Sequence, residues 1–365
     1  MTMIVFAAGG TGGHLYPAVA LAREFSRQDP ESRALFVGTG RGIESKVLAH
    51  EGLELAMIDA LPVMGRGVLR AAGALLSLPR GLRQSLALLR ARRADFVLGV
   101  GGYTSPPVLL AARLLGLPRA ILEPNAYPGM ANRVLGPIAD LVFVGFREPA
   151  GHFAPAKVRI TGVPVRRGFA EPSGTDGAVA GVSNRLLVFG GSQGARAINE
   201  AMLAALPQWA GLREEISIVH QTGEADHARV RAAYEAAGLR AEVVPFLFDM
   251  PKALRAADLV VSRAGAMTLA ELTACGKPAI LIPLPRAIHQ HQAHNAQALA
   301  VAGGAVVLPE QELSGERLAR EVAALVRDAG RLRVMGERSR GLGRPAAAEM
   351  IVRECLQLIG QRAQG

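Results

Sequence analysis

Five glycine-rich turns in this sequence have the composition and spacing that phosphate binding requires. They occupy residues 9–13, 38–42, 101–102, 190–194 and 264–265, and each follows a short apolar run. Glycine lets a phosphate approach the backbone closely, and the helix after such a turn offers unpaired N–H groups and a partial positive charge. Because the turns at 9–13 and 190–194 stand at equivalent places in two halves of the chain, they indicate a diphosphate-bearing ligand or pair of ligands.

Two titratable residues stand beside these turns. His14 follows the first turn directly, at the expected start of a helix, where the helix dipole favours the neutral imidazole that a general base requires. A purely structural histidine is the alternative interpretation. Glu271 follows the turn at 263–265 near the start of another helix. Its carboxylate could accept hydrogen bonds from sugar hydroxyls, as acidic residues after a glycine turn do for ribose, or could only complement the helix dipole.

Other classes of phosphate-binding enzyme lack their own motifs here. The run Gly10-Thr11-Gly12-Gly13-His14-Leu15 lacks the third glycine of the dinucleotide-binding fingerprint, and no acidic residue ends the second expected strand. The chain contains neither a G-x-x-x-x-G-K-[ST] P-loop nor an Asp-x-Asp metal motif, and no motif supports a cofactor-binding lysine of the phosphorylase kind. We therefore expect no metal and no cofactor.

The elements that must position these turns repeat in the order short apolar strand, glycine turn, helix, a pattern typical of parallel α/β sheets. We expect strands at residues 4–8, 34–37, 96–100, 120–122, 186–189, 216–220, 242–246, 259–261 and 279–282, and helices at 17–25, 195–206 and 346–359. The pattern restarts at Arg185, after a Gly/Ser-rich stretch. The sequence thus predicts two doubly wound domains, with ligands bound at the carboxyl ends of the strands in the cleft between them.

Length and composition limit the remaining possibilities. At 365 residues, half of them hydrophobic, the chain is long enough for about two domains with sizeable cores. Cys275 and Cys355 are too few for a disulfide framework, which fits a reducing cytoplasm. No basic residue precedes the first apolar run, so we interpret that run as a strand rather than a signal peptide, and no apolar run reaches the ~18 residues of a membrane span.

Positive charge is concentrated in the first half of the chain. Residues 1–170 hold 20 basic and 11 acidic residues, a net charge of +9 out of +10 for the whole chain. Only 4% of the residues are aromatic, which argues against base stacking, and we expect no nucleic-acid partner.

A leucine-rich segment, residues 60–94, has no acidic residue. It contains seven arginines: Arg66, Arg70, Arg80, Arg83, Arg90, Arg92 and Arg93. One interpretation is an ordinary amphipathic helix with a solvated basic face. The other is an interfacial patch whose leucines enter a leaflet while its arginines meet anionic lipids. Pro79-Arg80-Gly81 predicts a break, hence a loop and a helix rather than one long helix.

Five ordered motifs together resemble the MurG family of glycosyltransferases, and the resemblance covers residues 3 to about 355. They are Gly9-Gly10-Thr11-Gly12-Gly13-His14, Gly101-Gly102-Tyr103, Gly190-Gly191-Ser192-Gln193-Gly194-Ala195, Ala266–Glu271, and His291-Gln292 with Asn295. The resemblance implies a GT-B fold. It implies an acceptor and membrane-associating domain at 1–162, a UDP-sugar donor domain at 163–340, and a C-terminal helix at 341–365 that packs back towards the N-terminal domain.

The same resemblance implies the site residues. Thr11, Gly12 and Gly13 would contact the donor sugar and Asn125 its hydroxyls, while Arg166 and Ser192 would approach the diphosphate. Leu247 would lie against the uracil, and Gln292 would reach the sugar or diphosphate. The first residues of one helix would surround the diphosphate and ribose, and Glu271 among them would accept from the ribose hydroxyls. These residues are Ala266, Met267, Thr268, Leu269, Ala270 and Glu271. The acceptor loop would comprise Gly101, Gly102 and Tyr103.

The implied reaction is inverting transfer of N-acetylglucosamine from UDP-N-acetylglucosamine to the 4-hydroxyl of the muramoyl sugar of lipid I, giving lipid II. His14 or Glu123 would be the general base. Helix N-termini at Ser192 and Thr268, with Arg166, would stabilise the leaving UDP. The implied partners are the cytoplasmic membrane surface with its anionic lipids and other cell-wall synthesis proteins, with the enzyme peripheral on the cytoplasmic face. A UDP-N-acetylglucosamine 2-epimerase of the same fold, or a non-catalytic basic adaptor, are the alternatives.

Overall fold

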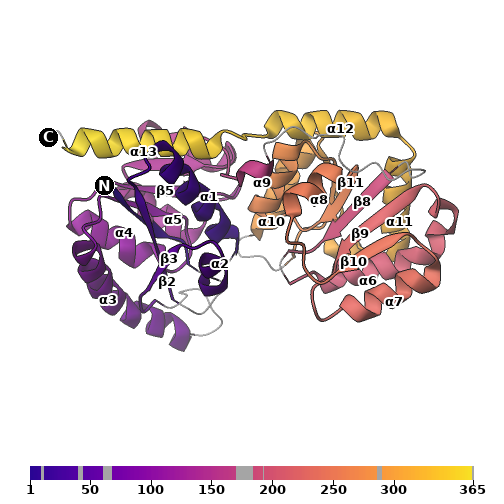
Figure 1. Ribbon diagram of the computed structural model, residues 1–365, viewed down its shortest axis with the longest axis horizontal. Helices are drawn as coiled ribbons and strands as arrows, with labels where there is room; N and C mark the ends of the chain where they lie inside the picture. The colour runs from indigo at the N-terminus through magenta and orange to yellow at the C-terminus, as the bar shows by residue number, and fades with distance from the viewer. Residues whose placement is uncertain are drawn as a thin grey trace. The chain divides into compact units, whose positions relative to one another are not determined.

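The computed structural model of the chain divides into two compact units (Figure 1). Unit 1 comprises Met1–Arg166 and Pro345–Gly365, and unit 2 comprises Arg167–Arg344. The structure describes residues 1–9, 12–39, 44–60, 68–169, 184–191, 193–285 and 290–363, without the side chains of 12, 68–77 and 363. The divisions thus fall after residues 166 and 344, where the sequence suggested boundaries after 162 and 340.

Unit 1 is built on a seven-stranded sheet in which every pairing is parallel, in the order β3-β2-β1-β4-β5-β6-β7. Its strands are β1 Met3–Ala7, β2 Arg33–Gly38, β3 Glu54–Met57, β4 Phe96–Gly99, β5 Arg119–Glu123, β6 Leu141–Val144 and β7 Val158–Ile160. Its α-helices are α1 Gly12–Gln28, α2 Glu44–His50, α3 Val68–Ala91, α4 Ser105–Leu114, α5 Met130–Leu135 and α13 Ala347–Ala363.

Helices cover both faces of this sheet, which is why its central strands are apolar without interruption. Along β1, Ile4 and Phe6 belong to the core under α1 and α13, whereas Val5 and Ala7 belong to the core under α3 and α4. In Figure 1, α13 runs beside α1 although the two are far apart in sequence. Helix α13 adds Ile351, Val352 and Cys355, which are all fully buried, to the core of unit 1.

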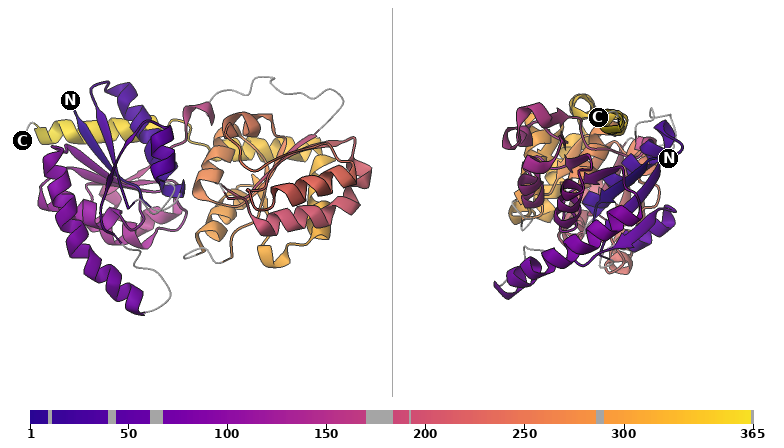
Figure 2. Two further views of the ribbon diagram at one scale, coloured as in Figure 1. Left: turned by 60° about the horizontal axis from the view of Figure 1, so that its bottom comes forward. Right: turned by 90° about the vertical axis from the view of Figure 1, so that its left-hand side faces the viewer.

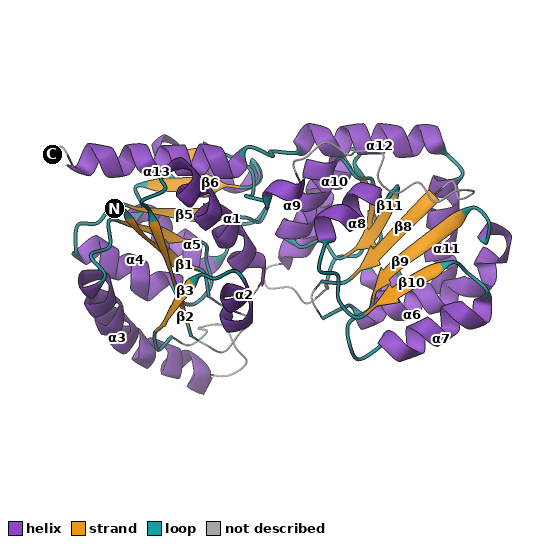
Figure 3. Cartoon of the chain, viewed as in Figure 1, coloured by secondary structure: helices purple, strands orange, loops and turns teal. Residues whose placement is uncertain are grey.

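Unit 2 repeats the arrangement with six parallel strands in the order β10-β9-β8-β11-β12-β13, of which Figure 3 labels β8 to β11. Its strands are β8 Asn184–Phe189, β9 Ile216–Gln221, β10 Ala241–Val244, β11 Leu259–Ser262, β12 Ala279–Leu281 and β13 Ala305–Val307. Its α-helices are α6 Arg196–Ala205, α7 His227–Ala237, α8 Met250–Ala256, α9 Ala266–Cys275, α10 His291–Val301, α11 Gly315–Val326 and α12 Ala329–Leu342. The prediction of two doubly wound α/β domains is confirmed.

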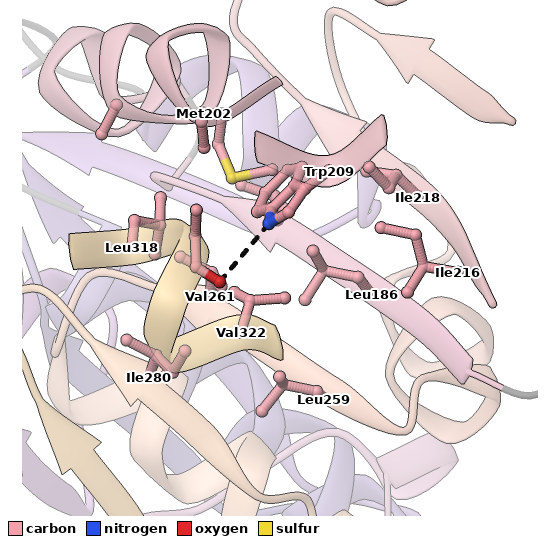
Figure 4. Packing of buried hydrophobic residues seen from close by; sticks show 14 of the residues in the cluster. Leu186, Met202, Trp209, Ile216, Ile218, Leu259, Val261, Ile280, Leu318 and Val322 are labelled. Carbon is pink, nitrogen blue, oxygen red and sulfur yellow. Dashed lines mark hydrogen bonds between the residues drawn. The ribbon is translucent and has the colours of Figure 1, made fainter. Parts of the chain in front are cut away.

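The single tryptophan of the chain, Trp209, lies at the centre of the unit 2 core. It is fully buried among residues that include Met202 and Leu186, and its Nε1–H donates to the Ala319 carbonyl at 3.5 Å (Figure 4). Because no other tryptophan exists, intrinsic tryptophan fluorescence reports the folding of unit 2 alone.

Four strands were not predicted from the sequence, and three of them lie at sheet edges. β3 and β13 are edge strands with partly exposed residues, so they lack the continuous apolar run that marks a buried strand. β7 is the third edge strand and is only three residues long. β6 is fully buried and apolar, but a run of four residues can equally be a buried helix segment.

Two predictions about helices were wrong. Helix α1 begins at Gly12 rather than at Pro17, so Pro17 lies inside the helix as its sixth residue, where it leaves the Gly13 carbonyl without its usual helical N–H donor. Helix α3 continues through Pro79 and Gly81 as one helix of 24 residues. Gly81 does not break the helix. It allows the helix to lie close to the backbone of Asp59, since a Cβ at this position would be 2.6 Å from the Asp59 carbonyl oxygen. Among the described residues, no helix is long and apolar enough to cross a membrane.

A buried histidine makes the stability of unit 2 dependent on pH. His220 on β9 is fully buried, and desolvation lowers its pKa from 6.5 to about 3. The unfolded chain therefore binds a proton below pH 6.5 that the folded chain does not, so stability is complete above pH 6.5 and falls as the pH drops towards 3. We expect this residue to cost about 2 kcal/mol of unfolding free energy between pH 7.5 and pH 5.

Urea unfolding followed by Trp209 fluorescence measures this effect. Asp226 also loses stabilising contacts on acidification, since hydrogen bonds from Arg229 and Asn199 lower its pKa. The His220→Gln variant carries the same Asp226 and serves as the control. If the unfolding free energy depended on pH equally in wild type and His220→Gln, the pH effect could not be assigned to His220.

Candidate active site

In unit 1 the glycine turns after β1 and β4 meet at the carboxyl edge of the sheet, where the strand order reverses. A Cβ on Gly102 would lie 2.5 Å from the Gly9 carbonyl oxygen, and Gly102 has φ +77°. Only glycine combines that backbone conformation with so close an approach. The Gly9 N–H donates to Thr104 Oγ1 at 3.0 Å, which fixes one turn to the other. This reversal point is where doubly wound sheets bind ligands.

His14 is the third residue of α1 and lies against the second of these turns. A Cβ on Gly101 would be 3.3 Å from His14 Nε2, and a Cβ on Gly102 would be 3.7 Å from Nδ1. The imidazole is half-buried and lies against the Gly101–Gly102 turn. The structure thus brings together His14, Gly101 and Gly102. Gly13 precedes His14 within α1, whereas Thr11 and the environment of Gly12 lie outside the described residues.

Tyr103 continues this cluster towards β2. Its hydroxyl is 3.2 Å from Thr39 Oγ1, so the turn after β4 is tied to the turn after β2. Ser105 at the start of α4 accepts from the Gly101 N–H at 3.1 Å and donates to the Ala7 carbonyl at 3.0 Å. These bonds hold the acceptor loop predicted from the sequence in one conformation.

Glu123, the last residue of β5, has both carboxylate oxygens engaged. Oε1 accepts from the Asn125 N–H at 2.9 Å and from Asn125 Nδ2 at 3.1 Å. Oε2 accepts from the Gly129 N–H at 2.8 Å and from Asn132 Nδ2 at 2.9 Å. The residue is only 1% exposed; burial raises the pKa of its carboxyl, and these four donors oppose that rise.

This geometry suits a residue that holds the segment after β5 rather than one that removes a proton from a ligand. A general base needs a carboxylate oxygen that the substrate hydroxyl can reach. The Glu123 oxygens instead fix Asn125 by its backbone and side chain and join it to Asn132 on α5. Asn132 also donates to the Leu122 carbonyl at 3.0 Å, which anchors α5 to the sheet.

Arg166 is the last residue of the first segment of unit 1. Its guanidinium carbon lies 5.5 Å from the centroid of the Tyr16 ring, a cation–π contact with α1. The positive charge therefore lies beside the N-terminal part of the helix that carries His14.

In unit 2 the corresponding reversal point lies between β8 and β11. The turn after β8 contains Gly191 with φ +99° and Gly194 with φ +73°, and the Gly194 N–H donates to the Gly191 carbonyl at 2.9 Å. Ser192, within this turn, lies outside the described residues. Helix α6 follows at Arg196, so its N-terminus faces the carboxyl edge of the sheet.

Helix α9 begins directly after β11 and carries the six-residue motif Ala266–Glu271. Gly265 is its N-cap and offers no side-chain acceptor, so the N–H groups of the first turn are left to a ligand or to water. Of the motif residues, Ala266, Met267 and Leu269 are buried, whereas Thr268 and Ala270 are half-buried. Glu271 is half-buried in the second turn, so the interpretation of a first-turn residue complementing the dipole is wrong.

Gln292 and Asn295 on α10 hold the segment between β11 and α9. Gln292 Oε1 accepts from the Ala264 N–H at 3.3 Å and from the Leu284 N–H at 2.9 Å, and Asn295 Nδ2 donates to the Ala264 carbonyl at 3.2 Å. Gln292 therefore positions the turn that precedes α9. Leu247, after β10, is half-buried, and the rings of its two neighbours in sequence, Phe246 and Phe248, contact each other edge to face with centroids 5.0 Å apart.

Several residues at these two edges carry no motif by which the sequence could have identified them. Glu44 opens α2 and is 1% exposed, with Oε1 3.2 Å from where a Cβ on Gly9 would lie. Asn132 and Asn199 each lie within a helix beside a charged residue, Arg133 and Glu200, a pattern shared by many surface positions. Among the described residues there is no group of three or more His, Cys, Asp or Glu side chains that could hold a metal ion.

Sequence comparisons match nearly the whole chain. The profile of the glycosyltransferase family 28 N-terminal domain matches residues 4–144, and that of the family 28 C-terminal domain matches residues 185–351. A protein of Syntrophus aciditrophicus is 47% identical over 356 residues, 98% of each chain, and one of Myxococcus xanthus is 45% identical over 361 residues, 99% of this chain and 94% of the other. Both are named UDP-N-acetylglucosamine--N-acetylmuramyl-(pentapeptide) pyrophosphoryl-undecaprenol N-acetylglucosamine transferase.

Solved structures give the same result. The crystal structure of Acinetobacter baumannii MurG matches with a TM-score of 0.79 and 29% identity, covering 98% of this chain and all of the other. A putative UDP-N-acetylglucosamine 2-epimerase from Listeria monocytogenes matches with a TM-score of 0.69 at 17% identity, covering 96% of this chain and 95% of the other. At that identity the second match shows a shared fold and nothing further.

Proposed function

This chain belongs to glycosyltransferase family 28, and on that premise we propose that it transfers N-acetylglucosamine from UDP-N-acetylglucosamine to N-acetylmuramyl-pentapeptide pyrophosphoryl-undecaprenol. The observation that carries the proposal is the 45–47% identity, over nearly the whole chain, to relatives named for this reaction. The chain is thus a UDP-N-acetylglucosamine-dependent N-acetylglucosaminyltransferase of peptidoglycan synthesis. The 2-epimerase alternative has only the fold in its favour.

The acceptor chemistry belongs to unit 1 in this proposal. The 4-hydroxyl of the muramoyl sugar forms a bond to the anomeric carbon of the donor while the bond from that carbon to the UDP oxygen breaks, with inversion. His14 takes the hydroxyl proton, because its imidazole is half-buried at the reversal point of the sheet. Glu123 is assigned to holding Asn125, because all four of its donors are protein N–H groups.

The donor chemistry belongs to unit 2. The first-turn N–H groups of α9 and the turn between β8 and α6 supply partial positive charge for the diphosphate, whose negative charge grows as the glycosidic bond breaks. Glu271 lies one turn further along α9, where its carboxylate accepts from the ribose hydroxyls. Gln292 fixes the turn before α9 through Ala264 and so keeps these N–H groups in place.

An assay with both substrates tests the proposal. Purified protein is incubated with UDP-N-acetylglucosamine and a soluble lipid I analogue, and the product mass is measured. We expect one added N-acetylhexosamine per acceptor and UDP release that depends on the acceptor. UDP release or sugar epimerisation without the acceptor would support the epimerase. Tight binding of anions without any turnover would support the non-catalytic adaptor.

We also place the protein peripherally on the cytoplasmic face of the membrane, where its lipid-linked acceptor would be anchored. The support is helix α3, whose N-terminal end projects beyond the rest of unit 1 (Figure 2). Residues 68–77 contain Arg70 as their single charged residue. The leucines of the second half do not face a leaflet: Leu89 is buried, and Leu82, Leu86 and Leu88 pack on the core of unit 1. The contact we propose therefore runs along α3, from its projecting N-terminal end to the exposed arginines of its second half and of the residues just after it.

Charge on α3 should control vesicle binding. Of the described arginines, Arg80 pairs with Asp59 at 2.7 Å and Arg92 with Glu54 at 2.5 Å. Arg83, Arg90 and Arg93 are exposed and can meet anionic lipid, each contributing about 1 kcal/mol near the surface. We expect the wild type to sediment with anionic vesicles and little with neutral ones, and less at high salt.

The test compares two variants of equal charge. Combined replacement of Arg83, Arg90 and Arg93 by Gln should abolish most of the sedimentation. The matched control replaces Arg213, Arg331 and Arg338, exposed arginines of unit 2, by Gln and should sediment like the wild type. Equal loss in both variants would mean that net charge, and not this surface, is responsible.

A further inference from the structure

Two loops of unit 2 contact each other backbone to backbone at the carboxyl edge of the sheet. They are the phosphate loop between β8 and α6, of which residues 190, 191 and 193–195 are described, and the support loop, residues 222–226 between β9 and α7. A Cβ on Gly194 would lie 1.9 Å from the Thr222 carbonyl oxygen, and a Cβ on Gly223 would lie 2.1 Å from the Gln193 carbonyl oxygen. Both glycines have positive φ, 73° and 80°. The position of the phosphate loop thus depends on that of the support loop.

Asn199 on α6, the helix that follows the phosphate loop, binds the support loop. Its side chain is 1% exposed, and Nδ2 donates to the Thr222 carbonyl at 3.0 Å and to Asp226 Oδ2 at 2.8 Å. Its backbone N–H donates to the Ala195 carbonyl at the end of the phosphate loop at 2.9 Å. That backbone bond is the first of helix α6, so what Asn199 adds is its side chain, which ties the helix that follows the phosphate loop to the support loop.

A buried pair, His220 and Tyr234, completes the hydrogen bonds of the Asn199 amide. The Thr222 carbonyl and the Asp226 carboxylate can only accept, so they require Nδ2 of Asn199 on their side and Oδ1 on the other. Oδ1 then accepts from His220 Nε2–H at 3.0 Å, and the lone pair on His220 Nδ1 accepts from the Tyr234 hydroxyl at 3.1 Å. Burial keeps the imidazole neutral, so a single tautomer satisfies the chain.

We propose that Asn199 is a positioning residue for the donor: it holds the support loop against the phosphate loop and thereby fixes the N–H groups that the phosphate loop presents to the UDP diphosphate. The Thr222 carbonyl and the Asp226 carboxylate set the orientation of the Asn199 amide, and His220 satisfies its remaining oxygen. The proposal rests on the proposed function, in which the phosphate loop binds UDP.

Two variants separate this role from simple stability. Asn199→Ala removes the link to the support loop, and we expect the Kd of UDP and the KM of the donor to rise roughly tenfold to 100-fold, the cost of misplacing binding groups by about 1 Å. Tyr234→Phe removes one hydrogen bond at the far end of the same chain and leaves both loop contacts. We expect its UDP Kd to change less than about threefold, as for a bond that does not touch the site.

Urea unfolding followed by Trp209 fluorescence shows how much stability each variant loses. The comparison is made under conditions in which both variants are fully folded. If Tyr234→Phe and Asn199→Ala weaken UDP binding in proportion to their loss of stability, the network is only structural and the proposal is overturned.

Amide hydrogen exchange on the full chain without ligand keeps this test independent of the proposed function. In Asn199→Ala we expect faster exchange at Gly194 and Gly223 and unchanged exchange in β8; in Tyr234→Phe both glycine amides should exchange as in the wild type. If the wild type does not bind UDP, the proposed function fails, and the exchange data still decide whether Asn199 holds the loops. Unchanged exchange in Asn199→Ala, or faster exchange with unchanged UDP affinity, overturns the inference.

Discussion

Replacing His14 by Ala is expected to lower kcat by about 10²–10⁴, the usual contribution of a positioned general base. The reason is local: the imidazole lies against the Gly101–Gly102 backbone at the reversal point of the unit 1 sheet, and the substitution removes the group that would take the acceptor proton. UDP binding, which we assign to unit 2, should change little. Initial rates at saturating donor and acceptor, with UDP titration by calorimetry, measure both quantities.

Glu123→Gln is the comparison that tests the assignment of the base. If Glu123 holds Asn125, this variant should weaken substrate binding more than it lowers kcat. The reason is that an NH2 group, which cannot accept, replaces one carboxylate oxygen that accepts from two N–H groups. A kcat of His14→Ala within a factor of about five of wild type, with a large loss in Glu123→Gln, would transfer the role of base to Glu123.

Replacing Glu271 by Ala should weaken the donor complex. A hydrogen bond to a charged group contributes about 1.5–3 kcal/mol, which corresponds to roughly a 10- to 150-fold loss in donor kcat/KM. The site lies one turn beyond the N–H groups of α9 that we assign to the diphosphate. The effect should appear in the donor KM and the UDP Kd, and not in the acceptor KM.

Two controls accompany this variant. Glu271→Gln keeps a carbonyl acceptor and should lose less affinity than Glu271→Ala. UDP can also be compared with inorganic pyrophosphate, which has no ribose. In Glu271→Ala the Kd of UDP should rise, whereas the Kd of pyrophosphate should stay as in the wild type. Equal weakening of both ligands would assign Glu271 to the shape of α9 rather than to the ribose.

The main strands and the glycine turns at their carboxyl ends could be predicted from the sequence, because strands buried on both faces are continuously apolar and glycine turns mark their ends. For the same reason the sequence alone identifies His14 and the Gly101–Gly102 turn as candidates. Their contact was not predictable, since it depends on the distance between turns about 90 residues apart in the chain.

The sequence does not show which polar side chains already have their hydrogen-bond partners within the protein. Glu123 was the alternative to His14 as base in the reaction that the family resemblance implies, and nothing in the sequence shows that four N–H groups meet its carboxylate. Likewise, the leucines of α3 have a helical spacing that suits a membrane or a core equally well. Only the packing of Leu82, Leu86 and Leu88 on the core of unit 1 decides between them.

The return of α13 to unit 1 has a consequence for synthesis on the ribosome. The last strand of the first sheet ends at Ile160, yet the face under α1 is completed by Ile351, Val352 and Cys355. At a bacterial elongation rate of about 5–20 residues per second, roughly ten to forty seconds separate these two events. During that interval the sheet has one incompletely covered apolar face while all of unit 2 is translated. The nascent chain therefore offers a binding surface for a chaperone, and stalled chains that lack α13 would keep it.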